Sequence, residues 1–508
     1  SYSFNEEFLR QHIMKAFSVV NYDYKFPTLT NIAYNYFVTY RSAYHKYPNK
    51  GRFAVINVDD PRYDRCNPLH PDLLERRAQA MDAVKTIFFN LDKKSATKQD
   101  FFQMSAIAIT SASLWFLRMY ENGKYCSFPH LVEFIQQPDE KMLSILDSYE
   151  ELKYFTSAFT DALKKESFEQ LSGQTASARI PLGQCATDEM FYTMTDPDNT
   201  GVNLRVNLPE EVTVLSIANN PETQQTNAPA LGLYMSQAAK LINAQGRVPC
   251  NFHVDELPTI FINGLNNLIA TARSNKVCVT LSAQDYTQLV MNYGKEIADT
   301  IFNTIDNLIS GKVAIETAEK IMKSIGRINY KNQSISLSEN ASSTISTQRE
   351  YTVPAEDIAQ LSQGEFVGVV SDSFKQPIEL KAFRGLVSPP KDDLGNLEVP
   401  INNPHVTKED LKANSKRIRD EIEAIITSEL KRLQSEKEEQ LALAEEQTME
   451  EFNLNEIVEP EFENAQKSEF LEDIPYEISE KEKIVSVKNK DMFYELLDTI
   501  EPITKLPD

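Results

Sequence analysis

The hydrophobic pattern of the chain alternates between the period of a buried strand and that of an amphipathic helix. Short apolar runs, typical of strands buried on both faces, occur at 18–26, 52–61, 211–221, 247–256 and 276–284. Helical spacing of apolar residues is found between them, at 4–16, 228–245, 262–274 and 286–304. Strands that alternate with helices in this way predict an α/β fold with a mostly parallel sheet.

A long helical block interrupts this alternation and divides the predicted sheet domain in two. Residues 71–170 show helical spacing throughout, with few glycines and few β-branched runs. An uncharged run at 101–117 carries Gln103 and several hydroxyl side chains, which favours a buried helix over a membrane span. We expect three units in this part of the chain, namely a first part of the α/β domain at 1–64, an all-α domain at 65–205 and the second part of the α/β domain at 206–385.

The last quarter of the chain has a different character. Residues 386–406 are rich in proline, which predicts a linker. Thr407 and Asp410 have the spacing of a capping box, and the apolar positions that follow predict an amphipathic helix or a short coiled coil. Residues 441–480 contain 13 acidic residues and one lysine, which predicts disorder. We therefore expect 407–508 to be an acidic tail, partly helical and partly disordered.

Charge and cysteine content exclude several classes of protein. The chain has 52 basic and 74 acidic residues, a net charge of −22, and residues 401–508 alone contribute 14 basic and 28 acidic residues. This balance argues against a protein that coats nucleic acid through bulk charge, but it leaves room for a local basic groove. The five cysteines are scattered without a C-x-x-C pair, which argues against a disulfide framework or a zinc site.

The strand at 247–256 ends in two adjacent carboxylates, Asp255 and Glu256. The carboxyl ends of parallel strands are where α/β proteins place their functional groups. In nucleotide hydrolases one such acid holds Mg²⁺ and the other activates water. The plainer interpretation of the pair is a solvated strand end. Downstream, Arg273 ends the following helix and Gln284 ends the next strand, where an arginine can act as a finger and a glutamine can sense a γ-phosphate. The plainer interpretation is that Arg273 caps its helix and that Gln284 makes a strand-end hydrogen bond. His253, within the strand, is expected to be a core residue.

The residues around this pair resemble the type IV coupling proteins, the TraG/TraD-like ATPases of bacterial conjugation and type IV secretion. The resemblance is strongest over 250–385 and rests on the stretch NFHVDELPTIFINGLNNLIATARSNKVCVTLSAQDYTQLVMNYG. Weaker likenesses are NYDYKF, DDPRYDRCNPL, VAIETAEKIMKSIG and YTVPAEDIAQLSQGEFVGVVSDS. The family pattern after the acid pair is matched by Ala283, Gln284, Asp285, Gln288, Leu289, Tyr293 and Gly294.

This resemblance implies a RecA-like P-loop NTPase domain with an all-α domain, assembled as a homo-hexamer on the cytoplasmic face of the bacterial inner membrane. It implies ATP and Mg²⁺ as cofactors. Carried over by position, Asp255 binds Mg²⁺, Glu256 is the catalytic base, Arg273 is a finger toward a neighbouring subunit and Gln284 senses the γ-phosphate. The implied partners are a relaxase with its single-stranded DNA, the ATPases of the type IV secretion channel and inner-membrane components.

The chain departs from the family in one respect, because no G-x-x-x-x-G-K-[ST] loop occurs in it. The helix at 4–16 leads into the first strand of the sheet. In a P-loop fold, the helix at this place directly follows the phosphate loop. We expect that loop, and a membrane segment, to lie upstream of residue 1, with Ser1 and Ser3 close to the phosphates. By itself this chain is expected to be inactive as an ATPase.

Two other functions remain open at this stage. The chain could be a recruitment adaptor that has lost ATPase chemistry and binds relaxase or effectors through its helical domain and acidic tail. It could also be another RecA-like secretion ATPase, although the stretch SAQDYTQL fits that class less well. A degenerate phosphate loop would favour the adaptor.

Overall fold

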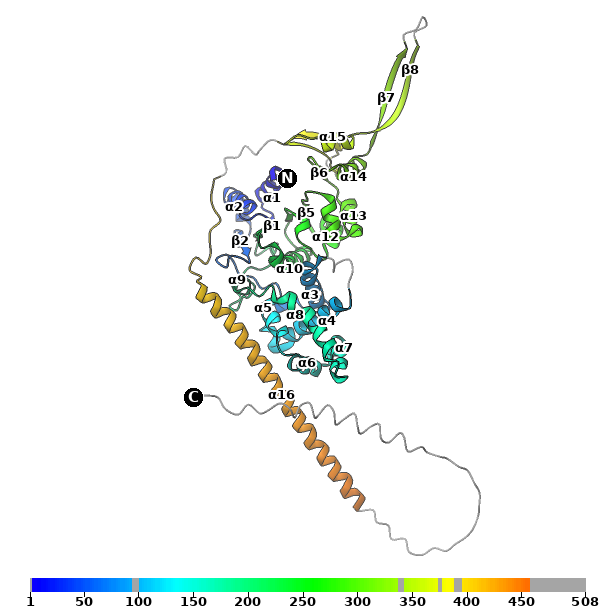
Figure 1. Cartoon of the computed structure of the whole chain (residues 1–508). Helices are drawn as coiled ribbons and strands as arrows, with labels where there is room; N and C mark the ends of the chain where they lie inside the picture. Colours follow the sequence, from blue (N-terminus) through cyan, green and yellow to red (C-terminus); the bar gives the residue numbers. More distant parts are fainter. Residues whose placement is uncertain (1, 94–99, 337–341, 373–376, 388–394, 457–508) are drawn as a thin grey trace, which may run out of the picture.

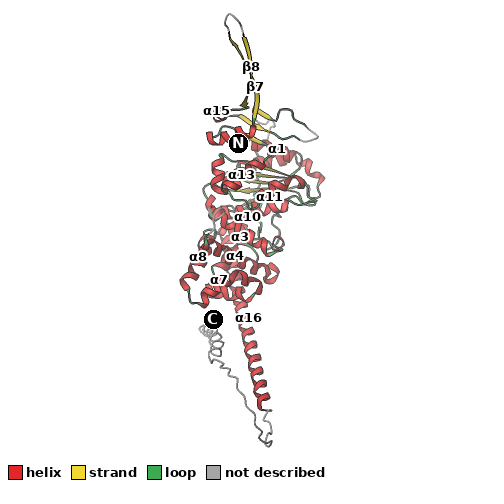
Figure 2. Ribbon diagram, turned by 90° about the vertical axis from the view of Figure 1, so that its right-hand side faces the viewer, coloured by secondary structure: helices red, strands yellow, loops and turns green. Residues whose placement is uncertain are grey.

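The computed structural model describes residues 2–93, 100–336, 342–372, 377–387 and 395–456. The molecule is elongated, with a parallel sheet in its middle third (Figure 1). A block of helices lies at one end, and a two-stranded hairpin projects from the other (Figure 2). Ser1 and residues 457–508, which include most of the segment predicted to be disordered, lie outside the described residues.

The central sheet has five parallel strands in the order β2-β3-β1-β4-β5. These strands are β1 (Ser18–Asp23), β2 (Arg52–Asn57), β3 (Thr213–Ala218), β4 (Cys250–Val254) and β5 (Val277–Leu281). Every residue of β1, β3 and β4 is buried, which explains their continuous apolar runs. The predicted α/β fold with a parallel sheet is confirmed.

Helices cover both faces of this sheet. Helices α1 (Tyr2–Met14) and α2 (Thr28–Thr39) form a core with Val19 and Val214 on one face. On the other face, helix α10 (Gln224–Ile242) packs with Val20 and Phe252. Strand β4 therefore runs through the centre of a three-layer sandwich, with a neighbouring strand on each side.

The helices between β2 and β3 form the helical block. They are α3 (Arg77–Leu91), α4 (Phe101–Met119), α5 (Phe128–Ile135), α6 (Asp139–Ser148), α7 (Lys153–Lys164), α8 (Phe168–Gly183) and α9 (Asp188–Thr193). Short 3₁₀ helices among the described residues are η1 (Arg41–Lys46), η2 (Pro71–Leu73), η4 (Tyr120–Gly123), η5 (Glu150–Leu152), η6 (Leu257–Thr259) and η7 (Ala272–Asn275). The block shares one continuous core with the sheet. Among the described helices, α4 included, none combines the length and apolar content needed to cross a bilayer.

After β5 the chain builds a smaller unit beside the sheet. Its helices are α12 (Tyr286–Tyr293), α13 (Lys295–Thr304), α14 (Ile315–Ile325) and α15 (Ala355–Ala359), while α11 (Leu265–Thr271) lies between β4 and β5. Its strands are β6 (Leu308–Ser310), β9 (Glu365–Val369) and β10 (Ala382–Leu386), which form an antiparallel sheet, and the hairpin β7 (Arg327–Ser336) and β8 (Ser342–Tyr351). The single helix predicted at 286–304 is wrong, because Gly294, at φ 78°, separates α12 from α13.

The tail begins with a long helix, α16 (Lys408–Glu456), which passes along the helical block and then projects beyond it (Figure 1). The predicted capping box is confirmed, since Thr407 Oγ1 accepts from the Asp410 N–H at 3.2 Å and the Asp410 carboxylate accepts from the Thr407 N–H at 2.9 Å. The helix includes 441–456, where the acidic composition predicts disorder. Its apolar face is buried against α5, α6 and α9 of the same chain.

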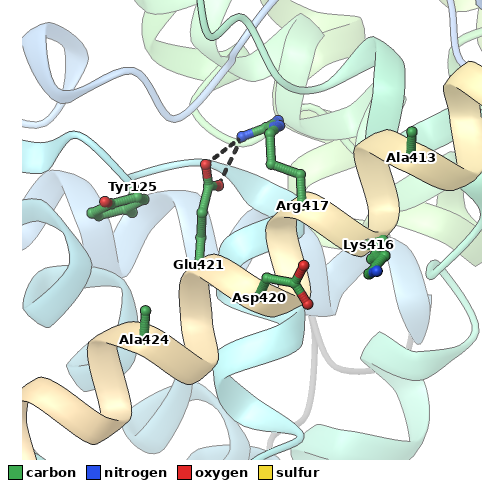
Figure 3. Close-up of a pocket in the computed structure, with 7 residues that line it drawn as sticks. All are labelled: Tyr125, Ala413, Lys416, Arg417, Asp420, Glu421 and Ala424. Carbon is green, nitrogen blue, oxygen red and sulfur yellow. Dashed lines mark hydrogen bonds and ion pairs between the residues drawn. The ribbon is translucent and has the colours of Figure 1, made fainter. Parts of the chain in front are cut away.

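Polar contacts accompany this packing. Glu421 accepts two hydrogen bonds from the Arg417 guanidinium, beside a shallow hollow lined by Tyr125 (Figure 3). The same carboxylate is bonded at 2.9 Å to the ring of buried His130 on α5. The first half of α16 is therefore an integral part of the helical block.

Candidate nucleotide-hydrolysis site

Two adjacent carboxylates lie at the carboxyl end of β4, which is between β1 and β5 in the sheet. The backbone at this point is held by both neighbouring strands. Asp255 N–H donates to the Tyr22 carbonyl at 3.2 Å, and Leu257 N–H donates to the Ser282 carbonyl at 2.8 Å. Because the carboxyl ends of β1, β4 and β5 meet at one edge of a parallel sheet, the pair faces the groups that follow those strands.

Asp255 is half-buried and has a specific side-chain partner. Its Oδ1 accepts a hydrogen bond from Asn5 Nδ2 of α1 at 2.7 Å. Burial raises the pKa of this carboxyl, and the Asn5 amide and the charge of Lys25 oppose that rise. The donors that favour the charged form are suited to a carboxylate that binds a cation.

Glu256 is more deeply buried, with 8 % of its surface exposed. Its Oε1 accepts from the backbone N–H of Gln284 at 3.3 Å. Burial raises the pKa of the Glu256 carboxyl, and the Gln284 N–H partly offsets this. A carboxylate whose pKa is raised toward neutrality is a better general base than an exposed glutamate.

The structure brings Gln284 to the acid pair, but it does not bring Arg273 there. Gln284 follows β5, so it lies at the same sheet edge as Glu256, with its side chain exposed. Arg273 lies in η7, before β5, and is therefore separated from that edge by the length of the strand, roughly 16 Å. It is exposed, as a finger that reaches another subunit must be.

The N-terminal end of α1 also lies at this edge, as the Asn5 to Asp255 hydrogen bond shows. Ser3 is in the first turn of that helix. Ser1 falls outside the described residues, so its predicted role stays a prediction. The free N–H groups and dipole of a helix N-terminus favour a negatively charged group such as a phosphate.

Two residues of this site were not foreseen from the sequence. Asn5 is buried beneath Asp255, and its Oδ1 accepts from Ser282 Oγ at 2.8 Å. In the sequence Asn5 is only a polar position in an amphipathic helix, and Ser282 only the residue after an apolar run. No local pattern connects them, because the contact spans 277 residues.

The acid pair can hold Mg²⁺ only if other ligands complete the coordination shell. Among the described residues there is no group of three or more histidine, cysteine, aspartate or glutamate side chains that could hold a metal. Mg²⁺ commonly takes one or two carboxylates and completes its shell with water and substrate phosphates. Asp255 therefore suits a cation that arrives with a nucleotide, and it does not form a metal site of its own.

His253 belongs to the core and not to the site. It is fully buried in β4, and burial lowers the pKa of its imidazole to about 3. The ring is therefore neutral in the folded protein at physiological pH. The prediction of a packed core histidine is confirmed.

The sequence and fold were compared with known proteins. Residues 249–363 match the family model described as the TraM recognition site of TraD and TraG. Curated protein sequences yielded no match to the chain.

Solved structures of similar fold include the unbound bacterial conjugative coupling protein TrwBΔN70, with a TM-score of 0.56, 13% identity, and coverage of 78% of this chain and 88% of that one. TrwB with the GTP analogue GDPNP has a TM-score of 0.54, 13% identity, and coverage of 76% and 88%. TrwB with ADP and Mg²⁺ has a TM-score of 0.53 at the same identity and coverage.

The family match covers one segment of the chain, and the solved structures share its fold. The matched segment begins just before β4 and includes the acid pair, Gln284 and the projecting hairpin. The fold is that of the TrwB coupling protein. The family match over 249–363 and the shared fold agree with the resemblance to the type IV coupling proteins that the sequence shows.

Proposed function

We propose that the protein is a coupling ATPase of conjugation and type IV secretion, which recruits relaxase-bound DNA and drives its translocation by ATP hydrolysis. The observation that carries the proposal is the acid pair at the carboxyl end of β4 in a RecA-like sheet. Asp255 is held by a side-chain amide, and Glu256 is held by the backbone of the residue expected to sense the γ-phosphate. A carboxylate for Mg²⁺ and a group that orients water are two of the parts that phosphoryl transfer to water requires from the protein.

Each residue has a distinct role in this proposal. Asp255 binds Mg²⁺, which would neutralise charge on the phosphates when bound. Glu256 takes the proton of the attacking water, and its raised pKa favours that transfer. Gln284, joined to Glu256 through its backbone, reports the γ-phosphate to the base. Arg273, exposed and remote from its own acid pair, reaches the site of a neighbouring subunit.

The phosphate-binding part of the site is not in this sequence, which contains no G-x-x-x-x-G-K-[ST] pattern. The described residues supply the N-terminus of α1, with Ser3 in its first turn, beside Asp255. We therefore expect the 508-residue chain by itself to bind ATP weakly and not to hydrolyse it at a useful rate.

The partners follow from the same proposal. The family description of residues 249–363 names a recognition site for TraM, which supports docking of this segment to the complex that prepares DNA for transfer. We propose a relaxase and single-stranded DNA as cargo, a homo-hexamer at the inner membrane as the working form, and the ATPases of the type IV channel as neighbours.

The proposal is tested with protein expressed from the complete reading frame. ATP hydrolysis and ATP binding are measured for the wild type, Glu256→Gln and Asp255→Asn. We expect Glu256→Gln to lower turnover about 10²- to 10⁴-fold while ATP still binds, because only proton transfer is lost. Asp255→Asn should weaken both binding of Mg²⁺·ATP and turnover. Hydrolysis that is unchanged in Glu256→Gln would exclude this residue as the base, and a wild type that never hydrolyses ATP would favour the adaptor.

A further inference from the structure

Asn5 makes two side-chain hydrogen bonds, and both go to strand ends at the acid pair. It lies in α1 and only 2 % of its surface is exposed. Its Nδ2 donates to Asp255 Oδ1 at 2.7 Å, and its Oδ1 accepts from Ser282 Oγ at 2.8 Å. One amide thus connects α1 to the residues that follow β4 and β5.

The Ser282 hydroxyl decides which end of the amide faces Asp255. An asparagine amide has a donor nitrogen and an acceptor oxygen, and the two ends can be exchanged by rotation. A hydroxyl that donates to the oxygen leaves the nitrogen pointing at the carboxylate. Ser282 is itself fixed, because its N–H donates to the Val254 carbonyl at 2.9 Å and its carbonyl accepts from Leu257 N–H at 2.8 Å.

Among the described residues, Asn5 is the one side chain that hydrogen-bonds to the Asp255 carboxylate, which also has a backbone partner at Tyr24. Its effect on that carboxylate is specific. A neutral donor holds one oxygen without adding a competing charge, so the group stays oriented and available to a cation. Partners of metal ligands act in this way, by fixing the orientation of the ligand.

We propose that Asn5 is a positioning residue, which holds Asp255 in the orientation that binds a divalent cation, and that Ser282 orients Asn5. The inference rests on the cation-binding role proposed for Asp255. Because the Asn5 side chain connects α1 to Asp255, a shift of this helix would also move the carboxylate.

Substitution of Asn5 gives two opposite perturbations. Asn5→Ala removes the side-chain donor and leaves Asp255 with its hydrogen bond to the Tyr24 backbone. Asn5→Asp replaces the amide nitrogen, 2.7 Å from Asp255 Oδ1, with a carboxylate oxygen. Two facing carboxylates repel each other, but together they form a stronger site for a divalent cation than one.

The test uses Mn²⁺ as the probe, since carboxylate ligands suit Mn²⁺ and Mg²⁺ alike. Binding of Mn²⁺ in the presence of ADP is measured for protein from the complete reading frame, from the electron paramagnetic resonance signal of the free ion and against ADP alone. The Tm of the same protein with ADP is measured with and without Mn²⁺. The variants are Asn5→Ala, Asn5→Asp, Ser282→Ala and Asp255→Asn. Gln11→Ala is the matched control, because this amide is on the same helix but bonds only to Glu7.

Asn5→Ala should weaken Mn²⁺ binding about 10- to 100-fold. Ser282→Ala should weaken it less, and Gln11→Ala should leave it unchanged. Asn5→Asp should lower Tm without Mn²⁺ and recover it with Mn²⁺, and a second substitution, Asp255→Asn, should abolish that recovery. If Asn5→Ala fails to fold, Ser282→Ala and Asn5→Asp carry the test.

The outcomes separate this inference from the proposed function. If the wild type with ADP binds no more Mn²⁺ than ADP alone does, or if Asp255→Asn binds it as the wild type does, the role proposed for Asp255 is wrong. If Asp255→Asn loses binding while Asn5→Ala and Ser282→Ala keep it, Asp255 retains its role and the positioning inference is overturned. Absence of Mn²⁺-dependent recovery in Asn5→Asp also overturns it.

Discussion

The first half of α16 should stabilise the helical block, and Ile422→Ala tests this. Ile422 is completely buried, and Ile418, Ile425 and Ile426 are buried beside it in the core that the helix shares with the block. If α16 were an independent tail, shortening one of its side chains would not affect the block. If it is packed as described, the substitution leaves a cavity in a shared core.

The size of the effect follows from this burial. Replacing a fully buried isoleucine with alanine removes its transfer free energy and leaves a cavity, which together cost about 2–5 kcal/mol. Leu441→Ala is the matched control on the same helix, because Leu441 is 48% exposed. That change should stay within about 0.5 kcal/mol.

The fluorescence of Trp115 reports on unfolding of the helical block. This residue is the only tryptophan of the chain, and it lies on α4 of the helical block, with its Nε1 donating to Glu151 at 3.1 Å. Its fluorescence in a urea titration should show a midpoint lowered by roughly 1–2 M in Ile422→Ala. Leu441→Ala should superimpose on the wild type. Equal midpoints for Ile422→Ala and the wild type would refute the docking of α16.

Three further predictions follow from other parts of the structure. Burial raises the pKa of Asp23 from 3.8 to about 6, so its contribution to stability is complete below pH 4 and is lost as the pH rises through 6. As the pH rises from 4 to 6, the free energy of unfolding of Asp23→Asn should therefore rise relative to that of the wild type, by at most about 3 kcal/mol. The Tm values of both proteins over this pH range check this, and a constant difference in Tm would contradict it. Gly232→Ala should lower Tm, because the new Cβ would lie 2.1 Å from Asn90 Nδ2 and displace the amide that holds Phe261, whereas an unchanged Tm would show that Asn90 can move away. Deletion of 328–350 should leave the Tm of the body unchanged, because Thr352 N–H already bonds to the Gly326 carbonyl at the base of the hairpin, and a large loss would show that the hairpin supports the body.

Much of the fold could be predicted because buried parallel strands impose a local signal. Strands β3 and β4 are buried at every position because both faces of the sheet are covered, and this burial favours the short, mainly apolar runs seen in the sequence. The break at Gly294 was missed because apolar spacing continues through it. The docking of α16 was missed for a different reason, since the same apolar stripe suits a coiled coil or a groove on its own chain, and only tertiary packing chooses between them.

Some residues of the candidate site could be predicted from the sequence and others could not. Asp255, Glu256 and Gln284 could be placed together from the sequence, because the ends of neighbouring parallel strands meet at one edge. Asn5 and Ser282 could not, since their hydrogen bonds connect positions that are 250 and 277 residues apart. Polar residues chosen by contacts of that range leave no trace in periodicity or spacing.

The central claim is that this protein couples ATP hydrolysis to DNA through the acid pair. The most direct measurement is ATP turnover by protein from the complete reading frame, with and without single-stranded DNA, for the wild type and Glu256→Gln. The account predicts that DNA stimulates the wild type, and that turnover of Glu256→Gln stays about 10²- to 10⁴-fold lower in either condition. Equal turnover of the two proteins in the presence of DNA would contradict it.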